Sequence, residues 1–174
     1  YQYQGRYFQL SDVLGVDREM CFSLSTDKYN EMDAEHFILE DIDGAVDFGE
    51  GTSRVYAQGK HYQILAMDGA YSQLVVNTYG KGHGVYFAGL PYSPQNCRIL
   101  LRAIYYAAGM ETEMKRYYVT NVETEVTVFQ KTGKIAVINN SKEAQHTDVY
   151  MKGSCVYELD LEPGEMRWVD DIME

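Results

Sequence analysis

Near the start of the chain, apolar side chains recur at helical spacing, and farther on the spacing changes to the alternation of strands. Tyr7 and Leu14 belong to a periodic face that predicts a helix over residues 4–14, and Gly15 suits the position just beyond a helix end. No capping residue or turn precedes this helix. We therefore expect the natural polypeptide to begin upstream of Tyr1.

An acidic stretch comes next, with nine Asp or Glu residues between positions 27 and 50 against the single basic residue Lys28. An apolar run at 20–24 predicts a strand before it, and residues 36–40 are a candidate strand within it. The excess of one charge is typical of a solvated surface loop, and we expect that structure here.

Between residues 54 and 90 the pattern is that of short strands separated by tight turns. Gly80, Lys81 and Gly82 stand between two β-rich runs, so we predict a hairpin whose glycines adopt positive φ. The apolar runs of this segment are residues 55–57, 62–66, 73–77 and 85–88.

The clearest helix is predicted over residues 94–108. Ser93 is a good N-cap, Pro94 suits the first helical position, and Gly109 suits the C-terminal cap. An apolar stripe indicates the buried face of this helix, and it consists of Cys97, Leu100, Leu101, Ile104, Ala107 and Ala108. The contacts that we expect join Leu100, Leu101 and Ile104 to Val85 and Phe87 of the hairpin.

Beyond a charged segment at 111–116 every pattern is that of β-structure, which predicts a small antiparallel β-sandwich of about 55–65 residues. We therefore divide the chain into the end of an α/β domain, residues 1–112, and an all-β domain, residues 113–174. The strands of the second part are expected at 125–130, 134–139, 147–150 and 155–159.

Composition restricts the partners and the compartment. A formal net charge of −11 disfavours binding to nucleic acid or to an anionic membrane, and the apolar runs are too short to cross a bilayer. Cys21, Cys97 and Cys155 have no metal-binding or redox spacing, so we expect reduced, buried thiols in a cytoplasmic protein. The 16 tyrosines have two interpretations: rings that stack on sugars, or rings that line strands and domain contacts, which we favour.

Several residues of suitable chemistry occur, but none stands in a motif that assigns a role. His36 lies near Glu40, Asp41 and Asp43, yet the spacing matches no zinc or EF-hand pattern, and a solvated loop is the favoured interpretation. His83 is a candidate general base, with simple exposure favoured. We therefore assign no catalytic, cofactor-binding or metal-binding residue and expect no cofactor.

The glycines at 80, 82 and 84 also suggest a phosphate-binding loop. A strand follows them instead of a helix, and the Lys-Ser/Thr pair of such loops is missing, so the hairpin is favoured. His61 and His146 lie in polar strand-edge contexts and indicate no function.

Six segments, taken together and in order, resemble the 1,3-β-galactosyl-N-acetylhexosamine phosphorylases, also called lacto-N-biose or galacto-N-biose phosphorylases. The ordered set is far more specific than any one segment, and the likeness weakens from about Lys142 onward. The segments are 3–17, 26–30 (TDKYN), 36–41 (HFILED), 45–51 (AVDFGEG), 85–93 (VYFAGLPYS) and 133–141 (GKIAVINNS).

The resemblance implies a bacterial enzyme of three parts: a partly broken (β/α)8 barrel, a glutamine-amidotransferase-like α/β domain and a small β domain. It also implies that phosphate attacks the galactosyl carbon with inversion while an Asp of the barrel protonates the leaving oxygen. No position of this chain matches that Asp. The chain is then a non-catalytic C-terminal region, inactive alone, whose partners are the N-terminal barrel and a second subunit of a homodimer.

Two other functions stay open at this stage. The tyrosines and the terminal sandwich also suit an autonomous carbohydrate-binding module, while a separate amidotransferase-type enzyme is disfavoured because no nucleophile elbow is present. The resemblance leaves the second sugar open among GlcNAc, GalNAc and rhamnose. We expect the chain to expose an apolar surface near Tyr1, Tyr3 and Tyr7, where the rest of the phosphorylase would cover it.

Overall fold

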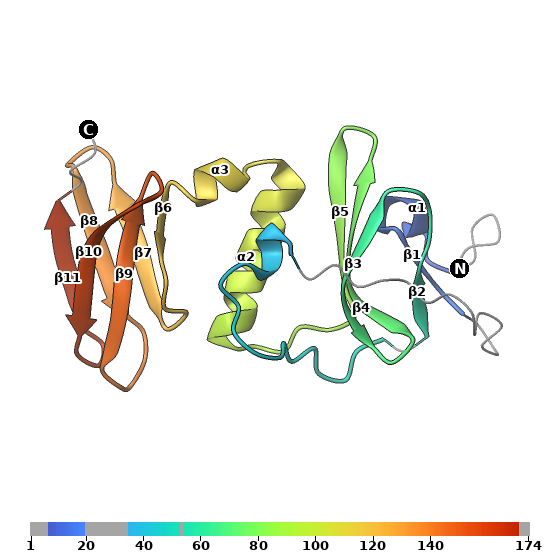
Figure 1. The fold of residues 1–174 in the computed structure, drawn as a ribbon, viewed down its shortest axis with the longest axis horizontal. Helices are drawn as coiled ribbons and strands as arrows, with labels where there is room; N and C mark the ends of the chain where they lie inside the picture. Colours follow the sequence, from blue (N-terminus) through green and yellow to red (C-terminus); the bar gives the residue numbers. More distant parts are fainter. Residues whose placement is uncertain (1–6, 20–34, 53, 171–174) are drawn as a thin grey trace. The chain divides into compact units, whose positions relative to one another are not determined.

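The computed structural model describes residues 7–19, 35–52 and 54–170, and the chain divides into two compact units, Tyr1–Gly109 and Met110–Glu174 (Figure 1). Strands dominate both units, and every strand pair in the described ranges is antiparallel. The strand predicted at 20–24 lies outside these ranges.

A three-stranded sheet forms the centre of the first unit, in the order β3 (Tyr62–Asp68), β4 (Tyr71–Tyr79) and β5 (Gly82–Phe87). The predicted hairpin is confirmed, because β4 and β5 pair directly and Gly80 between them has φ 60°. β2 (Val55–Ala57) covers the predicted residues and pairs with β1 (Val16–Arg18) in a separate two-stranded sheet.

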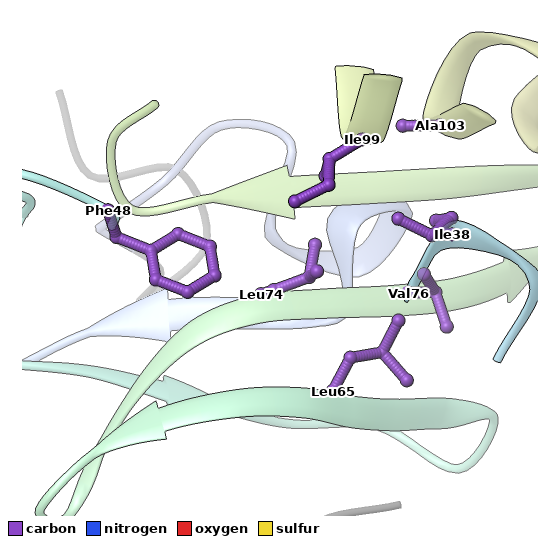
Figure 2. Close-up of a cluster of buried hydrophobic side chains, with 7 residues drawn as sticks. All are labelled: Ile38, Phe48, Leu65, Leu74, Val76, Ile99 and Ala103. Carbon is purple, nitrogen blue, oxygen red and sulfur yellow. The ribbon is translucent and has the colours of Figure 1, made fainter. Parts of the chain in front are cut away.

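Strand β4 is buried on both faces. Leu74 and Val76 point into a cluster with Ile99 of helix α2 (Pro94–Ala108), as Figure 2 shows. Val75, between them, belongs to a second cluster with residues of β1 and β2. Side chains alternate across a strand, so the apolar run at 74–76 supplies both layers of core.

The helix expected over 4–14 is only a single turn in the described residues, α1 (Ser11–Leu14). The buried carboxylate of Asp17 explains the difference. One of its oxygens accepts hydrogen bonds from the backbone N–H groups of Tyr7 and Phe8, at 3.0 and 2.9 Å, which holds these residues in a bend. Gly15 does end the helix in the left-handed conformation, with φ 71°.

Helix α1 is fixed to the sheet from two sides. Asn77 of β4 donates from Nδ2 to the carbonyl oxygens of Asp12 and Val13, both at 3.0 Å, which satisfies groups at the end of this short helix. Gly84 of β5 lies so close to the Val13 carbonyl that a Cβ atom would clash with it. Gly84 therefore serves close packing, and the structure agrees with the hairpin interpretation of these glycines.

The described part of the acidic stretch, residues 35–50, contributes to the core, contrary to our expectation of a solvated loop. The candidate strand at 36–40 is instead a 3-10 helix, η1 (Phe37–Leu39), and the Nδ1 of His36 accepts a hydrogen bond from the Ile38 N–H at 3.2 Å. Ile38 and Phe48 are buried in the cluster beneath α2, while the neighbouring carboxylates stay exposed. Phe37, Leu39, Ile42 and Val46 pack against the same cluster, so apolar residues spaced between the acidic ones anchor this segment.

Helix α2 spans the predicted residues with the predicted caps. The Ser93 hydroxyl accepts from the Asn96 N–H at 3.0 Å, and Gly109 closes the helix with φ 66°. The predicted face, however, is wrong: the residues buried are Asn96, Ile99, Arg102 and Ala103, whereas Leu100, Leu101 and Ile104 are 45%, 47% and 57% exposed.

Polar side chains that find partners inside the unit explain this orientation. Asn96 donates from Nδ2 to the carbonyl oxygens of Asp47 and Pro91, at 2.9 and 2.7 Å, and Arg102 pairs with Asp41. These hydrogen bonds and the ion pair offset part of the free energy that burial of the two polar side chains costs. The helix can therefore turn two polar residues inward and its apolar stripe outward.

Two three-stranded sheets make up the second unit and enclose one buried cluster, as expected for a small antiparallel β-structure. Helix α3 (Glu111–Met114) precedes them. One sheet contains β10 (Ser154–Leu161), β9 (Gln145–Met151) and β6 (Tyr117–Val119); the other contains β11 (Met166–Asp170), β8 (Lys134–Asn139) and β7 (Thr124–Phe129).

The orientation of α2 predicts opposite outcomes for two neighbouring truncations. Ile99→Ala removes a fully buried side chain and should lower the free energy of unfolding by about 2–5 kcal/mol. Leu100→Ala, at an exposed position, should change it by less than about 1 kcal/mol. Urea denaturation of both variants checks this, and a larger loss for Leu100→Ala would contradict the orientation.

Candidate functional site

His36 and His83, which lie far apart in the sequence, both contact the ring of Tyr106. Tyr106 of α2 lies against His36 in an edge contact, with ring centroids 4.7 Å apart, and against His83 of β5, with centroids 4.5 Å apart. His36 also caps η1, and Nδ1 of His83 lies 3.4 Å from the Thr78 hydroxyl. Both side chains thus take part in packing between α2, η1 and the sheet.

The carboxylate of Asp41 forms an ion pair with a buried arginine. Arg102 donates from its Nη2 atom to the carboxylate at 2.8 Å, and the exposed fractions of the two side chains are 4% for Arg102 and 42% for Asp41. Asp41 has φ 60°, an unusual conformation that aspartate tolerates better than most residues. This pair joins α2 to the end of η1.

Positive charge is concentrated beside this ion pair. Burial, and then the nearby charge of Arg102, lower the pKa of Arg98 on the preceding turn of α2. The Nε and Nη1 atoms of Arg102 are buried without a hydrogen-bond partner. His36, Glu40, Asp41 and Asp43 do not gather into a metal site, and no group of metal-binding side chains occurs elsewhere in the described ranges.

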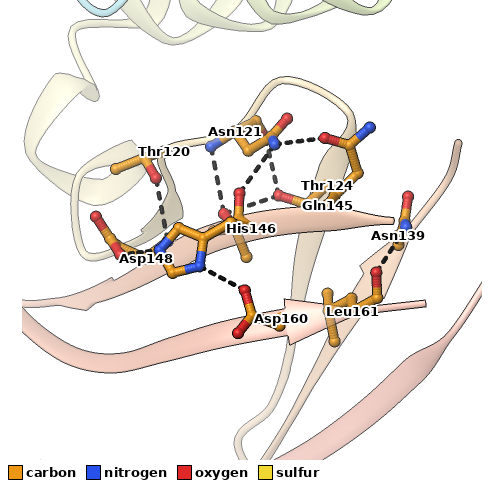
Figure 3. Close-up of polar contacts among 10 residues, drawn as sticks. Thr120, Asn121, Thr124, Asn139, Gln145, His146, Asp148, Asp160 and Leu161 are labelled. Atoms are coloured by element: carbon orange, nitrogen blue, oxygen red, sulfur yellow. Dashed lines mark hydrogen bonds and ion pairs between the residues drawn. The ribbon is translucent and has the colours of Figure 1, made fainter. Parts of the chain in front are cut away.

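In the second unit, polar side chains organise the connections between strands (Figure 3). Asn121 donates from Nδ2 to the side chain of Gln145 at 2.8 Å and to the His146 carbonyl at 2.9 Å, and Thr124 bonds to Thr147 at 3.0 Å. The fully buried Asn139 donates to the Leu161 carbonyl. The contacts to the His146 and Leu161 carbonyls satisfy backbone groups, and the other two join side chains of neighbouring segments.

His146, which carried no signal in the sequence, lies between two carboxylates on the outer face of β9 and β10. Its Nδ1 atom is 2.8 Å from Asp160 and its Nε2 atom 3.4 Å from Asp148. The hydrogen bond to Asp160 is the main cause that raises the pKa of His146 above its ordinary value. The group is fully exposed, so this is a surface charge cluster.

Aromatic side chains form two pairs on the second unit. Tyr118 and Tyr150 stack nearly parallel, with centroids 4.8 Å apart and an interplanar angle of 11°. Phe129 and Trp168 lie 5.3 Å apart at 44°, and both are exposed, at 44% and 54%. Most of the tyrosines placed by the structure line strands or packing contacts, but Phe129 and Trp168 offer ring surface to solvent.

Helix α2 presents a set of exposed apolar side chains that share one face of the helix. Contrary to our expectation of buried thiols, Cys97 on this face is exposed and free, as is Cys155 in the second unit; Cys21 lies outside the described ranges. Tyr1 and Tyr3, near which we expected the apolar surface, also lie outside them. We name the helix surface the α2 face: Cys97, Leu100, Leu101, Ile104, Ala107 and Ala108.

Comparison with known proteins identifies both units. The family model for the lacto-N-biose phosphorylase central domain matches residues 1–112, and the model for the C-terminal domain of the same enzymes matches residues 117–169. The chain belongs to the lacto-N-biose phosphorylase family. The resemblance seen in the six sequence segments is therefore confirmed.

Curated relatives of this family agree. The chain is 45% identical over 167 residues to a 1,3-beta-galactosyl-N-acetylhexosamine phosphorylase of Lachnoclostridium phytofermentans, covering 96% of this chain and 23% of the relative. It is 34% identical to the enzyme of that name from Bifidobacterium longum, covering 94% of this chain and 26% of the relative. A D-galactosyl-beta-1->4-L-rhamnose phosphorylase of L. phytofermentans is 27% identical, over 84% of this chain and 20% of the relative.

The chain thus spans about a quarter of the length of these two 1,3-beta-galactosyl-N-acetylhexosamine phosphorylases. No helix among the described residues has the length and apolar character needed to cross a membrane.

The Asp41–Arg102 pair generates a stability prediction. Asp41→Asn removes the charge that faces a buried guanidinium and should lower the free energy of unfolding by about 1–3 kcal/mol. Asp43→Asn, two residues away at an exposed position, is the matched control and should have an effect below about 0.5 kcal/mol. Equal losses for both variants in urea denaturation would show that the ion pair contributes nothing.

The His146 cluster generates a pH prediction. The pKa of His146 is raised in the folded state, so its positively charged form stabilises the fold. This stabilisation is fully present below the ordinary histidine pKa of 6.5 and is lost as the pH rises through the folded-state pKa. The melting temperature of wild type should therefore exceed that of Asp160→Asn most near pH 6 and converge with it in the alkaline range. An NMR titration of His146 with a midpoint at or below 6.5 would contradict this.

Proposed function

We propose that this chain is the non-catalytic central and C-terminal region of an inverting phosphorylase. The whole enzyme would cleave β-galactosyl-(1→3)-N-acetylhexosamine with phosphate to α-galactose 1-phosphate and the free N-acetylhexosamine. The observation that carries the proposal is the ordered match of the central and C-terminal domain models over a chain one quarter as long as its relatives. The rest of such an enzyme supplies the catalytic barrel.

The contacts in the structure support a structural role for the residues that had metal-binding or phosphate-binding alternatives. His36 caps η1, Asp41 pairs with Arg102, and Gly84 packs against Val13. An inverting phosphorolysis needs a carboxylic acid beside the leaving oxygen and cationic groups that hold phosphate. We infer that both sets belong to the barrel, in a cytoplasmic, homodimeric bacterial enzyme.

We assign residues 1–112, which include the first unit, to the end of a glutamine-amidotransferase-like α/β domain, and residues 113–174 to a β-sandwich domain. The covering of β3–β4–β5 by α2 on one face and by β1 and β2 on the other supports a layered domain for the first part. The likeness to amidotransferases transfers no activity, because a fold alone does not define a function.

One observation favours a second candidate function, a carbohydrate-binding module. The exposed Phe129–Trp168 pair has the ring surface that stacks on a pyranose. Titration of the chain with lacto-N-biose, followed by isothermal titration calorimetry, distinguishes the two functions, because this readout does not depend on Trp168, the single tryptophan of the chain. Saturable binding lost in Trp168→Ala would favour the module, and the absence of binding would favour the phosphorylase region.

The proposed function predicts that the 174-residue chain releases no galactose 1-phosphate from lacto-N-biose and phosphate. The physical reason is that the acid and the phosphate ligands lie in another part of the enzyme. A coupled assay for galactose 1-phosphate, with a whole relative as the positive control, measures this. Turnover by the chain above the buffer blank, lost on mutation of one of its own carboxylates, would overturn the assignment.

A further inference from the structure

Helix α2 has an apolar exposed side and polar residues on its buried side, the reverse of the usual arrangement for a helix at a protein surface. Its buried side includes the polar residues Asn96 and Arg102, which are held by Asp47, Pro91 and Asp41. Its outward side, the α2 face, contains six exposed residues without a single charge, in a chain whose residues are 24% charged. An uncharged, apolar helix face that points away from the core of its own unit is typical of a surface that another part of a protein covers.

The spacing on the α2 face is that of a packing seam. Cys97, Leu100 or Leu101, Ile104, and Ala107 or Ala108 follow one another at intervals of three and four residues. This places them in one continuous stripe along the helix. The two alanines at the C-terminal end leave room for a neighbouring surface to approach the backbone closely.

We propose that the α2 face is the docking surface for the N-terminal domain that precedes the central domain in these phosphorylases. This proposal rests on the proposed function. A domain described as central has another before it, and the relatives contain about three quarters of their length beyond the part that this chain matches. A polypeptide of that length is long enough to cover α2.

A second copy of the chain fits the α2 face less well. A stable interface between separate proteins usually needs about 20–30 residues from each partner, and this face offers six. A domain joined to α2 by the same polypeptide is held at high effective concentration, so a small apolar seam is sufficient to keep it in place.

Two of the three native thiols lie in the described ranges and provide the test, because both are exposed and Cys97 lies on the α2 face whereas Cys155 does not. N-ethylmaleimide labelling, read by peptide mass spectrometry, is compared between the 174-residue chain and the same polypeptide extended to the full length of the family. The chain is used at a concentration at which light scattering shows a monomer. Cys97 should react at least about tenfold more slowly in the extended polypeptide, while Cys155 changes little.

Each other outcome overturns the proposal. Equal Cys97 rates in the two polypeptides would show that the N-terminal domain does not cover the α2 face. Slow Cys97 labelling in the 174-residue chain would mean that the α2 face is already covered. A labelling rate that falls as the chain concentration rises would identify a second copy as the cover. Galactose 1-phosphate formation by the extended polypeptide is measured in parallel, so a failed phosphorylase assignment is distinguishable from a failed docking surface.

A pair of substitutions gives an independent measurement. Ile104→Glu places a charge in the α2 face and should lower the melting temperature of the extended polypeptide but leave that of the 174-residue chain unchanged. Tyr92→Glu is the matched control, because Tyr92 is 91% exposed and lies outside the face. Equal effects of Ile104→Glu in both polypeptides would contradict the proposal.

Discussion

Burial of strand β4 on both faces is the constraint on which the first unit depends. Leu74 and Val76 require a cover on one side of the sheet, and Val75 requires one on the other. The small β1–β2 sheet provides one cover, and α2 with η1 provides the other. Burial of a side chain of this size contributes about 1.5–3 kcal/mol, so neither layer can be lost without exposing much of the core.

Polar contacts then decide how the covering elements are oriented. Asn96 and Arg102 turn one side of α2 toward the sheet, and Arg102 and Tyr106 connect the helix to the segment that carries His36 and Asp41. Asn77 performs the same task for α1 on the opposite side. Residues that looked like candidates for chemistry are thereby used to align three layers of one domain.

The second unit is held together in a different way. Its two sheets share one core, and the buried Asn139 and Thr147 satisfy the backbone around the turns. A module of this size has little apolar area to spare, so well-paired turns limit the loss of free energy from unsatisfied groups. The exposed groups on its outer faces, His146 and Trp168 among them, are not needed for that core.

The sequence by itself determined the elements whose signals are local. Ser93 and Gly109 define the ends of α2, Gly80 defines the hairpin, and the ordered segments identify the phosphorylase family, because caps, turns and family motifs depend on neighbouring residues. Alternation likewise predicted β8 over its full length.

Only the tertiary structure decided which side of α2 is buried, since Asp47, which bonds to Asn96, and Asp41, which bonds to Arg102, lie 49 and 61 positions away in the chain. The backbone hydrogen bonds to Asp17 limited the first helix to one turn. The fold also brought His36 and His83 to the same ring, that of Tyr106. Hydrophobic periodicity ranks the faces of a helix by apolarity alone. It does not include hydrogen-bond partners from distant parts of the chain, which can make burial of a polar face more favourable.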